Sequence, residues 1–177
     1  KVKKVFVCPG NAGTALENDI ENIDIDISDT NSLVEFVQNN NILLTIIGPE
    51  GPLVEGIVNK FSEHGLKAFG PTKEHAILEG SKVFSKEFME NYDIPTSEYE
   101  MFSNKDEAKS YLISKKHPIV IKADGLAAGK GVVVSSSLEE SNDAIDKLLS
   151  AGHSDFIVIE EFLNGQELSA IYVCNYK

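Results

Sequence analysis

The first seventy residues alternate between short apolar runs and helical patterns of apolar positions. The apolar runs predict strands at 4–9, 23–27 and 42–49, and the segment 66–71 closes this part of the chain. The run at 42–49 is almost wholly apolar, which is typical of a strand buried on both faces. Strands that alternate with helices predict a parallel sheet.

Helical periodicity separates the apolar runs. Ser28 or Asp29 can cap a helix whose apolar face is formed by Leu33, Phe36 and Val37. A further helix is predicted after the loop at 48–52, with apolar positions at Leu53, Ile57, Val58 and Phe61. Gly65 is expected to end it.

The second half of the chain has a different order of elements. From Thr72 to Tyr92 the pattern is helical, and we expect this segment to connect two folded parts. The elements predicted after Pro95 are a strand at 98–102, a helix at 105–112, a hairpin over 120–134, a helix at 138–149 and a strand at 156–163. This order predicts an α+β unit.

The hairpin over 120–134 carries the most informative loop. Gly125, Gly129 and Gly131 permit positive φ and close backbone approach, so successive N–H groups can point at phosphate oxygens, and Lys122 and Lys130 add positive charge. The Walker pattern does not match, because its glycine spacing is one residue longer and Gly131 occupies its hydroxyl position. We expect a phosphate-covering loop of another kind. The alternative is a turn whose glycines serve only its geometry.

Glycine-containing loops follow the predicted strands of the first half. They are PGNAGT at 9–14, GPEGP at 48–52 and GPT at 70–72. Loops at the carboxyl ends of parallel strands form a ligand crevice. Asn11 and Thr14 can hydrogen-bond a sugar or phosphate, and Glu50 can bind hydroxyls or an amine. Alternatively, each loop is only a turn.

The last predicted strand ends in two carboxylates, Glu160 and Glu161. The apolar Phe162 and Leu163 follow, and this arrangement can line an adenine pocket, with Glu167 on the ribose hydroxyls. The alternative is a strand with a solvated acidic end. Lys82 is a third candidate cation, although an exposed helical lysine is the commoner case.

Composition limits the classes of function. The net charge of −12 argues against nonspecific nucleic-acid binding, which needs a basic surface. Cys8 and Cys174 lie in apolar runs and predict buried thiols in a reducing, cytoplasmic compartment. No apolar run reaches the ~18 residues that span a bilayer, so we expect no membrane partner. The four histidines lack metal-ligand spacing, so we expect no zinc site.

Seven motifs together resemble one enzyme family. Taken in order, they are PGNAGT, GPEGPLVEG, FGPT, LEGSK, FMENYDIPT, IVIKADGLAAGKGVVV and VIEEFLNGQE. Their combination resembles the phosphoribosylamine–glycine ligase family, the glycinamide ribonucleotide synthetases of purine synthesis, whereas single motifs indicate only the wider ATP-grasp superfamily. The resemblance implies an α/β chain with a Rossmann-like N-terminal domain lacking its first strand (1–71), a helical connector (72–95) and the N-terminal part of an ATP-grasp α+β domain with its phosphate-covering lid (96–177).

The resemblance also implies a reaction and its participants. ATP phosphorylates the carboxylate of glycine, and the amine of 5-phosphoribosylamine attacks the glycyl phosphate, giving glycinamide ribonucleotide, ADP and phosphate. Mg²⁺ or Mn²⁺ is the implied cofactor. Fusion to other purine-pathway domains remains open. The alternatives are another ATP-grasp carboxylate–amine ligase and a nucleotide-binding module without catalysis.

Site residues carry over from the family by motif. Lys122 and Lys130 are the implied catalytic residues. The implied ATP contacts are Lys82, Lys122, Asp124, Gly125, Leu126, Ala127, Ala128, Gly129, Lys130, Gly131, Glu160, Glu161, Phe162, Leu163 and Glu167. The residues implied to face phosphoribosylamine are Gly10, Asn11, Ala12, Gly13, Thr14, Pro49 and Glu50.

The chain departs from the family pattern in three places. The family begins one strand earlier, with a glycine-rich turn and a Gly-Arg-Glu motif, and its metal ligands lie beyond Lys177. The stretch at 150–155 is shorter than in the family. We therefore expect the chain to be part of a longer polypeptide, with no metal ligands within it.

Overall fold

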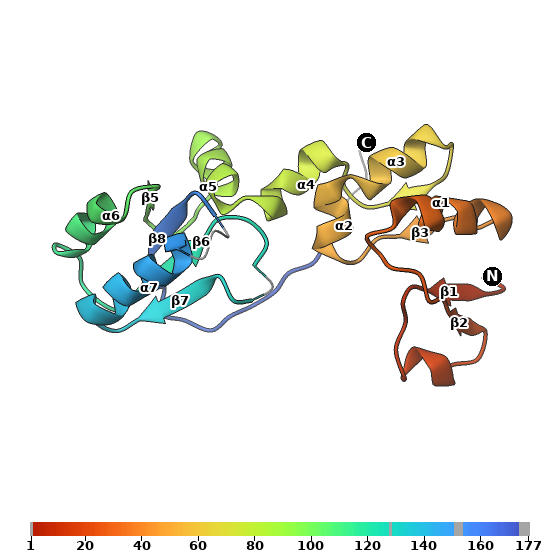
Figure 1. Ribbon diagram of the computed structural model, residues 1–177, viewed down its shortest axis with the longest axis horizontal. Coiled ribbons are helices and arrows are strands. Elements are labelled where there is room, and N and C mark those ends of the chain that lie inside the picture. Colours follow the sequence, from red (N-terminus) through yellow and green to blue (C-terminus); the bar gives the residue numbers. More distant parts are fainter. Residues whose placement is uncertain (1, 128, 151–153, 174–177) are drawn as a thin grey trace. The chain divides into compact units, whose positions relative to one another are not determined.

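The computed structural model describes residues 2–127, 129–150 and 154–173. The chain divides into two compact units, Lys1–Ser85 and Lys86–Lys177 (Figure 1). The expected division at residues 71 and 95 stays a prediction. No helix within the described ranges is long and apolar enough to cross a membrane.

The N-terminal unit contains two short parallel strand pairs. Its elements are β1 (Val5–Val7), η1 (Thr14–Leu16), β2 (Ile20–Asn22), α1 (Thr30–Asn39), β3 (Thr45–Ile46), α2 (Glu50–Glu55), α3 (Ile57–Glu63), β4 (Ala68–Phe69) and α4 (Lys73–Gly80). β1 pairs with β2, and β3 pairs with β4. The prediction of parallel pairing is confirmed, but within the described residues the strands form two separate sheets.

Two of the predicted strands were wrong in extent. Residues 23–27 form no strand, because β1 pairs with the preceding residues 20–22 and the Ile25 amide bonds back to the Ile23 carbonyl. In the run 42–49 only β3 is strand, and it has one neighbour in its sheet. Leu43 and Ile46 are therefore 87% and 70% exposed, and this strand is not buried on both faces.

The helices of this unit follow from local signals. Asp29 caps α1, accepting a 3.1 Å hydrogen bond from the Ser32 amide. The second predicted helix consists of two helices, because Gly56 has a left-handed backbone conformation, with φ 95°, and interrupts the helix between α2 and α3. The buried residues of α1 and α3 form a small core of Val34, Val37, Ile57 and Phe61.

The helical segment 72–92 also consists of two helices. α4 ends at Gly80, Ser81 has extended backbone with φ −138° and ψ 119°, and α5 runs over Lys82–Asn91. Asn59 of α3 accepts a 2.8 Å hydrogen bond from the Lys73 amide at the start of α4. This bond attaches α4 to the N-terminal unit.

The C-terminal unit has the predicted order of elements. They are β5 (Tyr99–Phe102), α6 (Lys105–Leu112), β6 (Ile119–Ala123), β7 (Val132–Ser135), α7 (Leu138–Ser150) and β8 (Ile157–Glu161). The strands form an antiparallel sheet in the order β5-β8-β6-β7. The hairpin is confirmed, whereas the last strand ends at Glu161, earlier than predicted.

One face of this sheet holds the hydrophobic core. Buried residues of α6 and α7 pack on alternate residues of β6 and β8, and α7 is seen against the sheet in Figure 1. The strand residues in this core are Ile119, Ile121, Ala123, Ile157 and Ile159. Because successive strand residues point to opposite faces, Lys122 and Glu160 lie on the other face.

Candidate functional site

A buried carboxylate between two lysines forms the centre of the candidate site. The Lys122 Nζ lies 2.9 Å from one oxygen of Glu160, and the Lys86 Nζ lies 3.2 Å from the other. The Ser97 hydroxyl donates a 2.7 Å hydrogen bond to the same oxygen as Lys86. The structure thus brings together Lys122 and Glu160, which the motifs named separately.

Strand register explains why these two side chains meet. Lys122 of β6 lies opposite Val158 of the antiparallel β8, and Glu160 is two residues farther along β8. Residues two apart share a face, and diagonal neighbours across an antiparallel pair are within reach of long side chains. A one-residue change in register would separate the pair.

The charges around Glu160 favour its ionised form. Burial raises the pKa of the Glu160 carboxyl, but hydrogen bonds from Lys122 and Ser97, with the charges of Lys122 and Lys86, outweigh burial. The pKa therefore lies below its ordinary value. A carboxylate held by two ammonium groups supports anion binding nearby better than it supports metal coordination.

The lowered pKa of Glu160 predicts acid sensitivity of the fold. A carboxyl whose pKa is lower in the folded state contributes stability above its unfolded pKa of about 4.3 and loses it as the pH falls through the folded pKa. We expect Glu160→Gln to weaken the dependence of the urea midpoint on pH in this acid range. A Glu87→Gln variant, at an exposed position on α5, is the control. Equal pH dependence in wild type and Glu160→Gln would contradict the prediction.

The loop between β6 and β7 is anchored at both ends. The Asp124 amide donates to the Phe156 carbonyl at 3.0 Å, and the Ala123 amide donates to the Gly131 carbonyl at 2.7 Å. Gly125 and Gly129 have φ values of 84° and 77°, as expected for a loop that turns its backbone toward a ligand. A Cβ on Gly131 would lie 2.5 Å from the Ala127 Cβ, so glycine is required there by close packing.

The loop's central side chains face solvent. Lys130 and Leu126 are exposed, and the Lys130 amide donates to the Ala127 carbonyl at 2.8 Å. Ala128 lies outside the described residues. The catalytic role of Lys130 and the phosphate contacts of the loop stay predictions.

The end of β8 and the residues after it were expected to line adenine and ribose. Glu161, the last residue of β8, accepts a 2.9 Å hydrogen bond from the Glu98 amide, which holds the start of β5. Phe162, Leu163 and Glu167 follow the strand and are exposed. The contacts of these three residues, and of Glu160 and Glu161, with a nucleotide stay predictions.

In the N-terminal unit, the side chains of the PGNAGT loop shape the loop itself. Asn11 Oδ1 accepts from the amides of Gly13 and Thr14 at 2.8 and 3.0 Å. The Thr14 hydroxyl donates to Asn22 Oδ1 at 2.7 Å, and Asn22 Nδ2 donates to the Asn11 carbonyl at 2.9 Å. The substrate-facing role of this loop, including Gly10 and Ala12, stays a prediction.

The second predicted substrate segment is partly helical. Pro49 precedes α2 as its N-cap. Glu50 was expected to lie in a loop, but it is the first residue of that helix. The two predicted substrate segments follow strands of different two-stranded sheets, β1–β2 and β3–β4. Their contact with a common substrate also stays a prediction.

Sequence reasoning named Lys82 and missed Lys86. Lys82 begins α5 and belongs to the N-terminal unit, so its phosphate contact stays a prediction. Lys86 is only 5% exposed and contacts Glu160 in the C-terminal unit. The available signal was the carboxylate at Glu160 directly after the apolar residues 157–159 of β8, because a buried carboxylate requires a cation.

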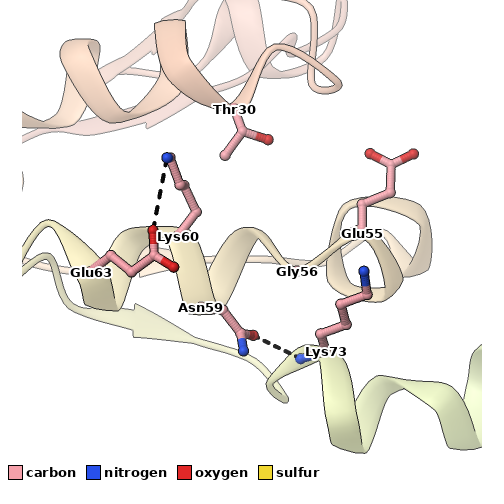
Figure 2. Close-up of a pocket in the computed structure, with 7 residues that line it drawn as sticks. All are labelled: Thr30, Glu55, Gly56, Asn59, Lys60, Glu63 and Lys73. Atoms are coloured by element: carbon pink, nitrogen blue, oxygen red, sulfur yellow. Dashed lines mark hydrogen bonds and ion pairs between the residues drawn. The ribbon is translucent and has the colours of Figure 1, made fainter.

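A cleft in the N-terminal unit is not the predicted site. Figure 2 shows the residues that line it, which are Thr30, Glu55, Gly56, Asn59, Lys60, Glu63 and Lys73. The cleft has a volume of about 360 Å³. Lys60 pairs with Glu63 at 3.8 Å. Because lysines and glutamates are equally represented here, the cleft offers no excess charge to an anion.

Metal ligands are not grouped in the described part of the chain. Residues 2–127, 129–150 and 154–173 contain no cluster of three or more histidine, cysteine, aspartate or glutamate side chains that could hold a metal ion. Glu160 is already paired with two lysines. The described residues therefore do not fit a metal site.

Comparison with known proteins covers the whole chain. Residues 1–79 match the family described as phosphoribosylglycinamide synthetase, N domain, and residues 80–177 match its ATP-grasp (A) domain. The phosphoribosylamine–glycine ligase of Haemophilus influenzae is 52% identical over 98% of this chain. The chain spans 42% of the length of that relative.

Solved structures share the fold. The phosphoribosylamine–glycine ligase of Thermotoga maritima is 33% identical, with a TM-score of 0.68 over 92% of this chain and 39% of its own. A biotin carboxylase domain from Hydrogenobacter thermophilus, solved with ADP, is 20% identical, with a TM-score of 0.64 over 85% of this chain and 36% of its own. The second likeness concerns the fold alone. The two family matches and the Thermotoga maritima structure confirm the expected α/β fold class, with an N-terminal domain followed by part of an ATP-grasp domain.

Proposed function

The chain belongs to the phosphoribosylglycinamide synthetase family, and we propose that its natural polypeptide joins glycine to 5-phosphoribosylamine at the expense of ATP. The observation that carries this proposal is the match of both halves of the chain to one family, supported by 52% identity to a ligase. The products are glycinamide ribonucleotide, ADP and phosphate.

Two chemical steps balance this reaction. An oxygen of the glycine carboxylate attacks the γ-phosphorus of ATP, and the bond between that phosphorus and the β,γ-bridging oxygen breaks, releasing ADP. The amine of phosphoribosylamine then attacks the glycyl carbon, and phosphate leaves as the amine loses a proton. Phosphoryl transfer depends mainly on positioning and charge stabilisation.

The described residues have separate tasks in this scheme. Lys122 is fixed on a strand beside Glu160, and in this proposal its ammonium group binds a phosphate oxygen of ATP. The loop from Asp124 to Gly131 covers the phosphates with backbone amides and Lys130. Covering the site also keeps water from the acyl phosphate, which would otherwise hydrolyse.

A divalent cation is the expected cofactor of an ATP-grasp ligase, with Mg²⁺ the proposed ion and Mn²⁺ the alternative. When bound, it would neutralise phosphate charge. The described residues do not fit its site, so no step is assigned to it here. Glycine likewise has no assigned pocket among these residues.

The decisive experiment measures ADP release by the natural polypeptide. With ATP present, we expect release only when glycine and phosphoribosylamine are both supplied, and loss of release when either is omitted. Release that ignores one of them would indicate another ATP-grasp carboxylate–amine ligase. Nucleotide binding without any release would indicate a binding module.

Gly10 offers a test of the proposed phosphoribosylamine loop. Its φ is 78°, and a Cβ there would lie 2.2 Å from the side chain of Asn22, which holds the loop. We expect Gly10→Ala to displace the loop and raise the KM for phosphoribosylamine roughly tenfold or more, with little change in the KM for ATP.

An exposed residue outside the predicted substrate segments supplies the control for this variant. Ser62 is exposed on α3, so Ser62→Ala should leave both KM values unchanged. An unaltered KM for phosphoribosylamine in Gly10→Ala would remove the loop from the proposed substrate site.

A further inference from the structure

Lys86 is a buried lysine that no motif accounts for. It lies on α5 and is 5% exposed. Its ammonium group donates hydrogen bonds of 2.7 Å to the hydroxyls of Thr96 and Ser97 and lies 3.2 Å from Glu160. The ring of Tyr99 is 5.1 Å away. An ammonium group has three donors, and here each has a partner.

Glu160 divides its two oxygens between two cations. Oε2 receives Lys86 and the Ser97 hydroxyl, and Oε1 receives Lys122. The Ser97 hydroxyl accepts from Lys86 and donates to Glu160, so it fixes both groups. The carboxylate is thereby held in one orientation with its Oε1 toward Lys122.

Side-chain exposure increases across the cluster of Lys86, Glu160 and Lys122. Lys86 and Glu160 have side-chain exposures of 7% each, while that of Lys122 is 28%. Two ammonium groups and one carboxylate leave one positive charge in excess. Because Lys86 offsets Glu160 from the buried side, the excess charge is available at the exposed end, on Lys122.

Removing Lys86 would weaken the attraction of Lys122 for phosphate. Glu160 would remain paired with Lys122 alone, and a half-buried ion pair with no excess charge attracts a phosphate group less. Attraction between opposite charges is stronger where water is scarce, so the carboxylate would compete effectively with phosphate for Lys122.

We propose that Lys86 is a positioning residue for nucleotide binding: by neutralising Glu160 it leaves the charge of Lys122 available to the phosphates of ATP. The inference rests on the proposed function in one respect, the identity of the nucleotide. It adds a residue that acts through Glu160 and Lys122 without touching ATP.

The test measures the Kd for ATP, by calorimetry, with the natural polypeptide and no other substrate. We expect Lys86→Met to weaken ATP binding about tenfold or more, a change of ~1.4 kcal/mol. Lys86→Arg keeps the charge and should stay within about threefold of wild type. Lys109→Met removes a lysine that pairs with Asp146 between α6 and α7, and as the matched control it should leave the Kd unchanged.

A double-mutant cycle separates this role from a purely structural one. In the Lys86→Met background, adding Glu160→Gln removes the carboxylate that holds Lys122 and should recover most of the lost ATP affinity. In the wild-type background, where Lys86 already neutralises the carboxylate, the same change should strengthen binding by a clearly smaller factor. Coupling of this sign between the two substitutions is the signature of the charge mechanism.

Two outcomes would overturn the proposal. One is an ATP Kd in Lys86→Met within about twofold of wild type, and the other is equal effects of Glu160→Gln in both backgrounds. Urea midpoints of all variants confirm folding. If Lys86→Met does not fold, an ATP Kd more than about threefold weaker in the charge-retaining Lys86→Arg would overturn the proposal. If ATP binds but ADP release ignores glycine or phosphoribosylamine, the proposed function fails while the role of Lys86 stands.

Discussion

Replacement of Lys122 by methionine should lower ADP formation by the natural polypeptide on the order of 10²–10³-fold, because it removes a fixed positive charge where charge develops on the transferred phosphoryl group. Methionine retains much of the length and apolar character of the lysine stem. The fold should survive, because Glu160 keeps Lys86 and Ser97 as partners. The measurement is steady-state ADP release with saturating glycine and phosphoribosylamine.

A matched lysine shows whether the effect is specific. Lys116 is exposed before β6, and Lys116→Met should leave ADP release unchanged. The urea midpoint of Lys122→Met should lie near that of wild type. Turnover within about twofold of wild type would remove Lys122 from the proposed phosphate site.

Replacement of Ile121 by alanine should lower the stability of the fold and leave kcat nearly unchanged, which is the opposite of what we expect for Lys122→Met. Ile121 neighbours Lys122 on β6 but lies on the core face of the sheet, where it is 0% exposed and packs with α6 and α7. Deleting a buried isoleucine side chain to Cβ lowers the free energy of unfolding by about 2–5 kcal/mol. At a temperature where the variant remains folded, its kcat should stay close to the wild-type value.

Urea-induced unfolding of the natural polypeptide measures this loss. Val134 on β7 is 55% exposed in the same sheet, and Val134→Ala should cost less than ~1 kcal/mol. A similarly small loss of unfolding free energy for Ile121→Ala would mean that the core on this face contributes little to the stability of the unit. Together, the two neighbouring substitutions separate catalysis from folding on the two faces of one strand.

The sequence determined the elements whose signals are local. The pattern along the chain placed α6 and the β6–β7 hairpin, and Asp29 was one of two residues expected to cap α1. The glycines of the loop indicated backbone that turns toward a ligand, and Gly125 and Gly129 do have positive φ. These features depend on residues close together in the chain, so pattern and stereochemistry are sufficient to predict them.

Motif order determined the family, but not the partners of single residues. The seven motifs indicate the ligase family from the sequence alone, and both family matches confirm it. The same motifs placed Lys122 and Glu160 in separate roles. Nothing in their spacing shows that one carboxylate serves two lysines.

Only the tertiary structure decided register, burial and pairing over long distances. The run at 23–27 alternates as a strand should, yet β1 pairs with residues 20–22. Lys86 has the sequence context of an ordinary helical lysine, yet it is buried against Ser97 and Glu160. The physical reason is the same in both cases: register and ion pairing depend on which segments become neighbours in space, and that follows from packing of the whole unit.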